Sequence, residues 1–356
     1  MSRRFVGTVL VGAATLALPS ALSGSQLTIY ILLGLAGMVT IGLSLLMGYA
    51  GQVSLGQASF YAIGGYTAGL ISVHGGPSLL GLLAAPVLAA AIALLVGVPI
   101  LRLRGHQLAF ATLALQLILL SLLSDASWAG GAIGLQGIPH LSIAGVELDQ
   151  DIDYAYLTWA GVAVTMIVAH NVVASRTGRG LRALATSETA AAASGVPVGR
   201  YRLLVFALSA GFAGLAGGIY AYYLGYLAPG SFPVLLSIQY VVMAVVGGLG
   251  TIWGGLLGAA AITLLVQVLT DLGTRPGMPS YAPSVLSYAV YAVLLVLVVL
   301  FLPRGLAPAL RAGWQWRRSA PLPRAEPPGV PGVPDAAGSS TASAGEVVRS
   351  GEELRG

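Results

Sequence analysis

Residues 176–223 read RTGRGLRALATSETAAAASGVPVGRYRLLVFALSAGFAGLAGGIYAYY, and they change from polar to apolar halfway along. The first half is basic, with arginine at positions 176, 179, 182, 200 and 202. The second half is an apolar span with many small residues, in which Gly214 and Gly218 lie four residues apart. Small residues at this spacing are typical of membrane helices that pack closely, so we expect both glycines to serve helix packing.

A short helix is predicted inside the basic half, within SETAAAASGVP at residues 187–197. Ser187 or Thr186 can cap its N-terminus, Glu188 lies in its first turn, and Gly195 ends it. A capped helix on the arginine-rich side, between two apolar spans, favours a docking element for a cytoplasmic partner. The alternative is a loop that only faces solvent, as most charged loops do.

The composition is that of a polytopic membrane protein. Of 356 residues, 56% are hydrophobic and only 8% are charged, and the mean hydropathy is +0.87, whereas a soluble domain carries roughly 25% charged residues. Cysteine is absent, which excludes disulfides and thiolate metal sites. Lysine is absent too, so the chain has no Walker A motif and any ATPase must be a separate polypeptide. The net charge of +5 follows the loops between spans and gives no sign of nucleic-acid binding.

Apolar runs predict an all-α fold of about ten membrane-spanning helices, because several runs reach the ~20 residues that cross a bilayer. Eight or nine would remain if the third segment is re-entrant, or if the first, within residues 1–26, is a cleaved signal peptide. Residues 27–306 are expected to form the transmembrane domain, and residues 313–356, rich in Pro, Ala, Gly and Ser, a disordered tail. The expected spans lie at 5–22, 27–47, 48–70, 79–101, 107–123, 154–173, 203–223, 235–246, 253–269 and 285–302.

Arginine sets the expected orientation, because short cytoplasmic loops carry an excess of positive charge. With ten spans, the arginines at 102, at 176–202 and from 304 onward fall on one side, together with both termini. The acidic segment 125–153 contains no basic residue and falls on the other side. We therefore expect both termini and the arginine-rich segment to be cytoplasmic.

The segment GYAGQVSLGQASFYAIGGYTAGL, residues 48–70, is apolar enough to enter the membrane but is interrupted by glycines and amides. Glycine-rich interruptions mark transport sites and close packing alike, so two interpretations are open. The segment lines a substrate pathway, or it only packs helices. The pathway interpretation has as its candidate residues Gln52, Ser54, Gln57, Ser59, Gly64 and Gly65. Another glycine set, Gly250, Gly254 and Gly258, is spaced to share one helix face and is expected to pack.

Other function classes find little support. No predicted span carries a central Asp, Glu, Arg or Lys, which disfavours an ion-coupled secondary transporter. The four histidines do not pair at a metal-ligand spacing, and no nucleophile, base and orienting residue occur together. We therefore expect no metal, no cofactor and no enzymatic activity.

Several motifs resemble the permeases of branched-chain amino acid ABC importers, of the LivM type. They are the glycine-rich segment 48–70, LRLRGHQLAFATLALQLILL at 101–120, the stretch 178–232, VVGGLGTIWGGLLGA at 245–259 and FLPRGL at 301–306. Together they cover most of residues 27–306 in family order. The glycine-and-glutamine signature and the span after the arginine-rich segment are quite specific, whereas the apolar runs between them are not.

The resemblance implies a permease subunit in the bilayer of the bacterial plasma (inner) membrane. Its partners would be a homologous second permease, two cytoplasmic ABC ATPases and an external solute-binding protein. In such a permease the segment 176–202 would couple to the ATPase, with Glu188, Gly195, Arg182 and Arg200 as the candidate coupling residues.

The substrate implied is a branched-chain or related hydrophobic amino acid. The chain departs from the family pattern at His106-Gln107, at Gln116 and in AGGAIGL at 129–135, and these positions bear on the substrate route. Permeases for urea and short amides resemble the same family and stay an alternative, as does an ion-coupled secondary transporter.

Overall fold

The computed structural model describes residue 19 and residues 22–103, 105–143 and 145–273. The predicted span 285–302 and the predicted tail 313–356 lie outside these residues, as does nearly all of the predicted first span. Seven helices in the described part are long and apolar enough to cross a membrane, so the predicted all-α, polytopic membrane fold is confirmed.

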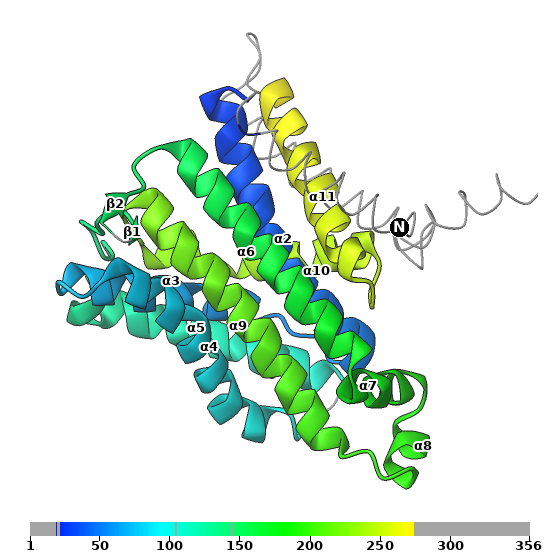
Figure 1. The fold of residues 1–356 in the computed structure, drawn as a ribbon. Coiled ribbons are helices and arrows are strands. Elements are labelled where there is room, and N and C mark those ends of the chain that lie inside the picture. The colour runs from blue at the N-terminus through cyan, green and yellow to red at the C-terminus, as the bar shows by residue number, and fades with distance from the viewer. Residues whose placement is uncertain (1–18, 20–21, 104, 144, 274–356) are drawn as a thin grey trace, which may run out of the picture. The chain divides into compact units, whose positions relative to one another are not determined.

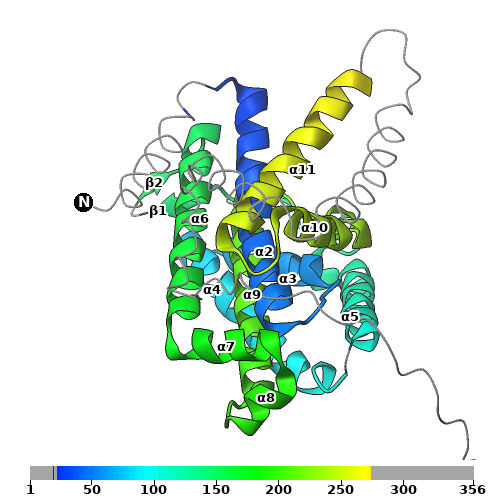
Figure 2. The same ribbon diagram turned by 90° about the vertical axis from the view of Figure 1, so that its right-hand side faces the viewer.

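A helix stands at each of the eight predicted spans between residues 27 and 269, and two further helices, α7 and α8, precede α9 (Figures 1 and 2). One short hairpin, β1–β2, interrupts the helical order. The elements are α2 Gly24–Ala50, α3 Gln57–Val73, α4 Ser78–Ile100, α5 His106–Asp125, η2 Ser127–Ala129, β1 Ser142–Ile143, β2 Val146–Glu147, α6 Asp151–Ala174, α7 Arg176–Thr186, α8 Glu188–Ala193, α9 Val198–Leu224, η3 Pro229–Ser231, α10 Val234–Gly247 and α11 Ile252–Gly273.

Helix α9 packs against α2, α3 and α4, and most of its length is buried (Figure 1). Its small residues allow this, because a Cβ at Gly64 of α3 would meet the backbone of Gly214. A Cβ at Gly217 would likewise meet the carbonyl of Tyr61. On its other side, Gly218 approaches Ala85 of α4, where a Cβ would come within 2.9 Å of the alanine methyl group. Backbones this close maximise van der Waals contact, which holds helices together where lipid gives no hydrophobic driving force.

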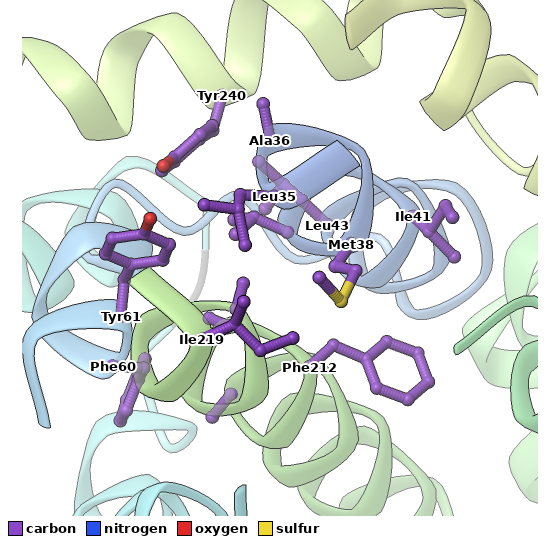
Figure 3. Close-up of a cluster of buried hydrophobic side chains, with 14 of the residues drawn as sticks. Leu35, Ala36, Met38, Ile41, Leu43, Phe60, Tyr61, Phe212, Ile219 and Tyr240 are labelled. Atoms are coloured by element: carbon purple, nitrogen blue, oxygen red, sulfur yellow. The ribbon is translucent and has the colours of Figure 1, made fainter. Parts of the chain in front are cut away.

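Larger apolar side chains fill the space between α2, α3, α9 and α10 (Figure 3). Phe60 of α3 meets Phe206 of α9 edge to face, with ring centroids 5.4 Å apart. Tyr61 packs on Phe232 at 5.7 Å. These ring contacts and the glycine contacts described above together fix the rotation of α3 about its own axis. They therefore also fix the position of residues 51–56, which precede α3. The cluster in Figure 3 also contains Leu35, Met38, Ile41, Leu43, Phe212, Ile219 and Tyr240.

The glycines at 250, 254 and 258 do not share one helix face, because α11 begins only at Ile252. Gly250 lies in the turn before the helix with φ +73°, and its N–H donates to the carbonyl of Ser44 at 3.2 Å. Gly254 and Gly258 lie on α11 against Gly247 of α10. The prediction that these three glycines form one stripe is therefore wrong. Gly250 is a turn glycine that contacts α2, and Gly254 and Gly258 are helical glycines that contact α10.

The segment between α5 and α6 has little helix, and it is anchored to the rest of the chain by backbone and hydroxyl contacts. Leu135 and Leu227 exchange backbone hydrogen bonds of 2.8 Å. The N–H of Ser142 donates to the hydroxyl of Ser78 at 2.8 Å. Tyr222 of α9 then donates its O–H to the carbonyl of Ser78 at 2.7 Å, so α4, α9 and the hairpin meet at one point.

Replacing Gly64 by alanine is expected to destabilise the bundle, because the new methyl group meets the backbone of Gly214, which cannot rotate away. Overpacking of this kind costs about 1–3 kcal/mol. Thermal unfolding of the purified chain in detergent, followed by tryptophan fluorescence, measures the effect.

Gly199→Ala is the matched control, because Gly199 lies in the first turn of α9 with nothing within 4 Å of an added Cβ. Alanine there should leave the unfolding temperature unchanged or raise it, since glycine costs a helix roughly 0.5–1 kcal/mol relative to alanine. Equal stability of the two variants would contradict the packing argument.

Candidate functional site

The helix predicted over residues 48–70 is broken near its start. Helix α2 continues to Ala50 and ends on Gly51, which has φ +64°, and the chain then runs without helical structure until α3 begins at Gln57. Glycine suits the end of α2 because it enters the left-handed region at no steric cost. The break therefore presents two helix ends, and the carbonyls of one and the N–H groups of the other lack partners within their helices.

Side chains from other helices satisfy part of this exposed backbone. The N–H of Leu55 donates to the hydroxyl of Thr112 on α5 at 2.9 Å. The N–H of Ala58, in the first turn of α3, donates to the hydroxyl of Ser237 on α10 at 2.9 Å. The break is thus a built structure, held by two helices that are distant in sequence.

Gln116 of α5 extends this polar network. Its side-chain carbonyl accepts the O–H of Ser237 at 2.7 Å, and its amide donates to the carbonyl of Phe232 at 3.1 Å. Gln116 and Ser237 are completely buried. Gln116 therefore joins α5 to α10 as an interhelical contact, a common role for a neutral glutamine in a membrane span.

The four polar candidates of the pathway are all buried at the break. The Gln57 amide donates to the hydroxyl of Ser209 on α9 at 3.2 Å. Ser59 donates its O–H back to the carbonyl of Gly56 at 2.6 Å, and Ser54 lies within the same turn. The side-chain carbonyl oxygens of Gln52 and Gln57 have no hydrogen-bond partner among the described residues. Buried acceptors normally have a partner, so these two oxygens mark the break as one place where a ligand or water could bind.

The two glycines of the pathway set lie elsewhere. Gly64 and Gly65 face the backbone of α9 around Gly214 and Gly217, in the helix contact described above, about two turns beyond the break. The structure therefore brings Gln52, Ser54, Gln57 and Ser59 together and places the two glycines in packing.

The apolar residues near the break also diverge. Phe60 is fully buried against Phe206. Ile63 instead lines an apolar cavity of about 430 Å³ between α3, α4 and α5, together with Leu88, Leu119 and Trp128. The hydrophobic side chains of α3 therefore do not converge on one wall beside Gln57.

The second candidate region is the arginine-rich segment, which folds as two helices (Figure 2). Helix α8 has the predicted bounds and caps. The hydroxyl of Ser187 accepts the N–H of Ala190 at 3.3 Å. At the other end Gly195 has φ +79°, and the N–H groups of Gly195 and Val196 donate to the carbonyls of Ala192 and Ala191 at 3.0 Å each. This double closure is a Schellman motif, for which glycine is the favoured residue.

Helix α7 was not predicted, because the arginines between residues 176 and 182 indicate a polar loop. Its sequence signal is the spacing of Leu181 and Leu184, which are both buried, after the cap residue Ser175. In Figure 2, α7 lies across the end of α6. Arg182 strengthens this corner, because its guanidinium donates to the carbonyl of Val173 in the last turn of α6 at 2.7 Å.

A further contact joins α8 to α9. The guanidinium of Arg202 donates to both carboxylate oxygens of Glu188, each at 2.9 Å. Neither the capping pattern nor the motif resemblance pointed to Arg202, since the two residues are 14 positions apart and lie on different helices. Of the other coupling candidates, Gly195 and Arg200 are exposed.

Within the described residues no group of three His, Cys, Asp or Glu side chains could hold a metal ion. The polar groups described at the break are amides, hydroxyls and backbone groups, and those of the arginine-rich region include guanidinium groups and the Glu188–Arg202 ion pair. The arrangement can bind and orient a polar solute or contact a protein.

Comparison with known proteins connects both regions to transport. Residues 25–299 match the family described as a branched-chain amino acid transport system permease component. The high-affinity branched-chain amino acid transport system permease proteins LivM of Escherichia coli and Salmonella typhimurium are each 29% identical over 308 residues, covering 80% of this chain and 68% of theirs. The autoinducer 2 import system permease protein LsrC of Klebsiella pneumoniae is 31% identical over 149 residues, 40% of this chain and 42% of its own. No solved structure gives a significant match.

The match to the family covers the glycine-rich break, the arginine-rich helices and the glycine contacts of α9, α10 and α11. It extends to the predicted span beyond the described residues. The chain therefore belongs to the family of branched-chain amino acid transport permeases, the membrane-spanning components of ABC importers.

Proposed function

We propose that this chain forms one half of the transmembrane pathway of an importer for branched-chain amino acids. A homologous second permease completes the pathway, two cytoplasmic ATPases drive it, and an external binding protein delivers the substrate. The observation that supports this substrate class is the similarity to LivM along 308 residues, which spans 80% of this chain. ABC permeases as a class work with ATPases and binding proteins, and the absence of lysine from this chain is consistent with a separate ATPase.

The α2–α3 break is the part of the pathway that this chain supplies. An amino acid enters the membrane with an ammonium and a carboxylate group, both of which need polar partners once water is excluded. The buried side-chain carbonyl oxygens of Gln52 and Gln57 have no hydrogen-bond partner among the described residues. The N–H of Ala58, in the first turn of α3, already donates to the hydroxyl of Ser237. We therefore place the ammonium group, rather than the carboxylate, at this break.

Side-chain discrimination at such a site is weak, because one methylene in a hydrophobic wall is worth only about 1–3 kcal/mol. The apolar residues of α3 point to different neighbours, Phe60 to Phe206 and Ile63 to the cavity beside α5. Both facts support a pathway that recognises the amino acid backbone and leaves the choice among Leu, Ile and Val to the binding protein.

We place the arginine-rich helices α7 and α8 at the cytoplasmic side and propose that they contact the ATPase there. The excess of arginine on this side of the predicted spans supports the orientation. Helix α8 exposes Thr189, Ala190, Ala192 and Ala193, and a short, small-residue helix of this kind fits a groove on a soluble partner.

The test of the substrate class is uptake by the complete complex reconstituted in liposomes. Radiolabelled leucine should accumulate only when ATP and the binding protein are present. Radiolabelled urea should not accumulate under the same conditions. Urea uptake without leucine uptake would assign the chain to the alternative substrate class.

Replacing Gln57 by leucine in the same liposomes should lower leucine uptake by roughly tenfold or more, since hydrogen bonds to charged groups contribute about 1.5–3 kcal/mol. The substitution keeps the volume and removes the proposed acceptor. Assembly with the partner subunits, measured by co-purification, should persist.

Thr165→Val is the matched control, because it removes a fully buried hydroxyl of α6 that donates to the carbonyl of Val162 in its own helix, away from the break. It should leave uptake per assembled complex unchanged. If Gln57→Leu lowers the unfolding temperature and the yield of complex but likewise leaves uptake per assembled complex unchanged, residue 57 serves packing alone.

The orientation is testable because the chain has no cysteine. A cysteine replacing Ala192 on α8 should react with a membrane-impermeant maleimide only after the cells are opened. A cysteine replacing Ile133, which is 76% exposed in the segment after α5, should react in intact cells. The reverse pattern would invert the proposed topology.

A further inference from the structure

The ion pair between Glu188 and Arg202 has a geometry that fixes two helices relative to each other. Two parallel hydrogen bonds of 2.9 Å join the planar guanidinium to the carboxylate. Such a two-point contact sets orientation as well as distance, unlike a single charge–charge contact. Because Glu188 opens α8 and Arg202 lies in the second turn of α9, the pair spans the linker that contains Gly195 and Pro197.

The surroundings of the pair make it more than a mobile surface contact. The side chain of Arg202 is 19% exposed and that of Glu188 is 37% exposed. Nearby apolar contacts hold the same corner, where Ala191 is buried and a Cβ added to Gly180 of α7 would meet the ring of Tyr201. The carboxylate of Glu188 is therefore directed to its own chain, while the neighbouring residues of α8 face outward.

Helix α9 leads from this pair to the α2–α3 break. Ser209 lies seven residues after Arg202, close to two turns along the same helix and thus on nearly the same face. Its hydroxyl accepts the Gln57 amide at 3.2 Å. Hydrogen bonds and the α9 backbone therefore connect α8 to Arg202, Arg202 along α9 to Ser209, and Ser209 to Gln57.

We propose that the Glu188–Arg202 pair is the strut that makes α8 and α9 move as one rigid body, so that a displacement of α8 reaches the break at Gln57. Glu188 and Arg202 are positioning residues in this role, and the ATPase contacts the exposed face of α8 rather than the Glu188 carboxylate. The inference rests on the proposed function for its coupling role. The rigid connection between α8 and α9 lies within this chain and does not depend on the partner subunits.

A mechanical link benefits from this contact because the turn between α8 and α9 is closed mainly by backbone hydrogen bonds. Gly195 is exposed and an added Cβ there would meet nothing within 4 Å, and the next residue, Val196, lies beside Gly180 of α7. With the pair broken, α8 could pivot about residues 194–197 without moving α9. A displacement of α8 caused by the ATPase would then not be transmitted to α9.

The experiment uses the charge-reversed variants Glu188→Arg and Arg202→Glu and the double variant that carries both. Uptake of leucine per ATP hydrolysed is measured in liposomes, and hydrogen exchange of residues 188–196 is measured in the same complexes. Each single variant should lower the transport-to-hydrolysis ratio several-fold and speed exchange in α8. The double variant should return both values most of the way to those of the original chain, because the pair is restored with its charges exchanged, although arginine in the first turn of α8 is less favourable than glutamate.

Arg102→Glu is the control for charge reversal, because Arg102 is an exposed arginine at the end of α4, outside the α7–α9 region. It should change neither measurement. Unchanged single variants, or a double variant that stays uncoupled while the ATPase subunits remain bound, would overturn the strut.

Failure of the proposed function gives a different pattern. In that case the original chain binds no ATPase and shows no ATP-driven uptake, and hydrogen exchange alone decides the rigid connection. Restored protection of α8 in the double variant would then support the fixed α8–α9 unit. Exchange that stays fast in the double variant would overturn it.

Discussion

The close approach of α3 and α9 is the constraint on which the rest of the structure depends. At Gly64 and Gly217 a single added methyl group would meet the backbone of the facing helix. Helices in lipid gain no hydrophobic energy from association, so contact at this distance is a main source of their cohesion. The contact also sets where α3 begins. Because Gln57 lies two turns before Gly64 on the same helix, the position of the break follows from glycines that never touch it.

A second constraint follows from the first, because a break inside a bundle exposes backbone groups that cannot reach water. The hydroxyl groups of Thr112 and Ser237 meet this constraint, because they accept hydrogen bonds from the N–H groups of Leu55 and Ala58. Gln116 then satisfies Ser237. Packing and polar satisfaction thus cooperate: α9 positions α3, and α5 and α10 make its interrupted start tolerable. The side-chain carbonyl oxygens of Gln52 and Gln57 have no hydrogen-bond partner among the described residues, and they are the acceptors at this break on which the proposed pathway relies.

Local patterns predicted most of the fold and little of the site's connectivity. Long apolar runs fixed the spans, and the capping residues Ser187 and Gly195 fixed α8. Helix α7 was missed because its arginines hide a two-leucine face, and Gly250 was misplaced because spacing alone cannot tell a turn from a helix. The partners of the break could not be foreseen. Ala58 and Ser237 are 179 residues apart, and nothing in a span's periodicity reveals which distant hydroxyl it meets.

The same separation has a consequence for how the protein is made. A chain enters the membrane from its N-terminus as it is synthesised, so α2 and α3 arrive long before their supporting side chains. Leu55 must wait 57 residues for Thr112, and Ala58 must wait for Ser237 on α10. Until then the broken segment is unfavourable in the bilayer core, because each unsatisfied backbone group there costs several kcal/mol. The segment therefore gains the hydroxyl partners of Leu55 and Ala58 only after α5 and α10 are both in place.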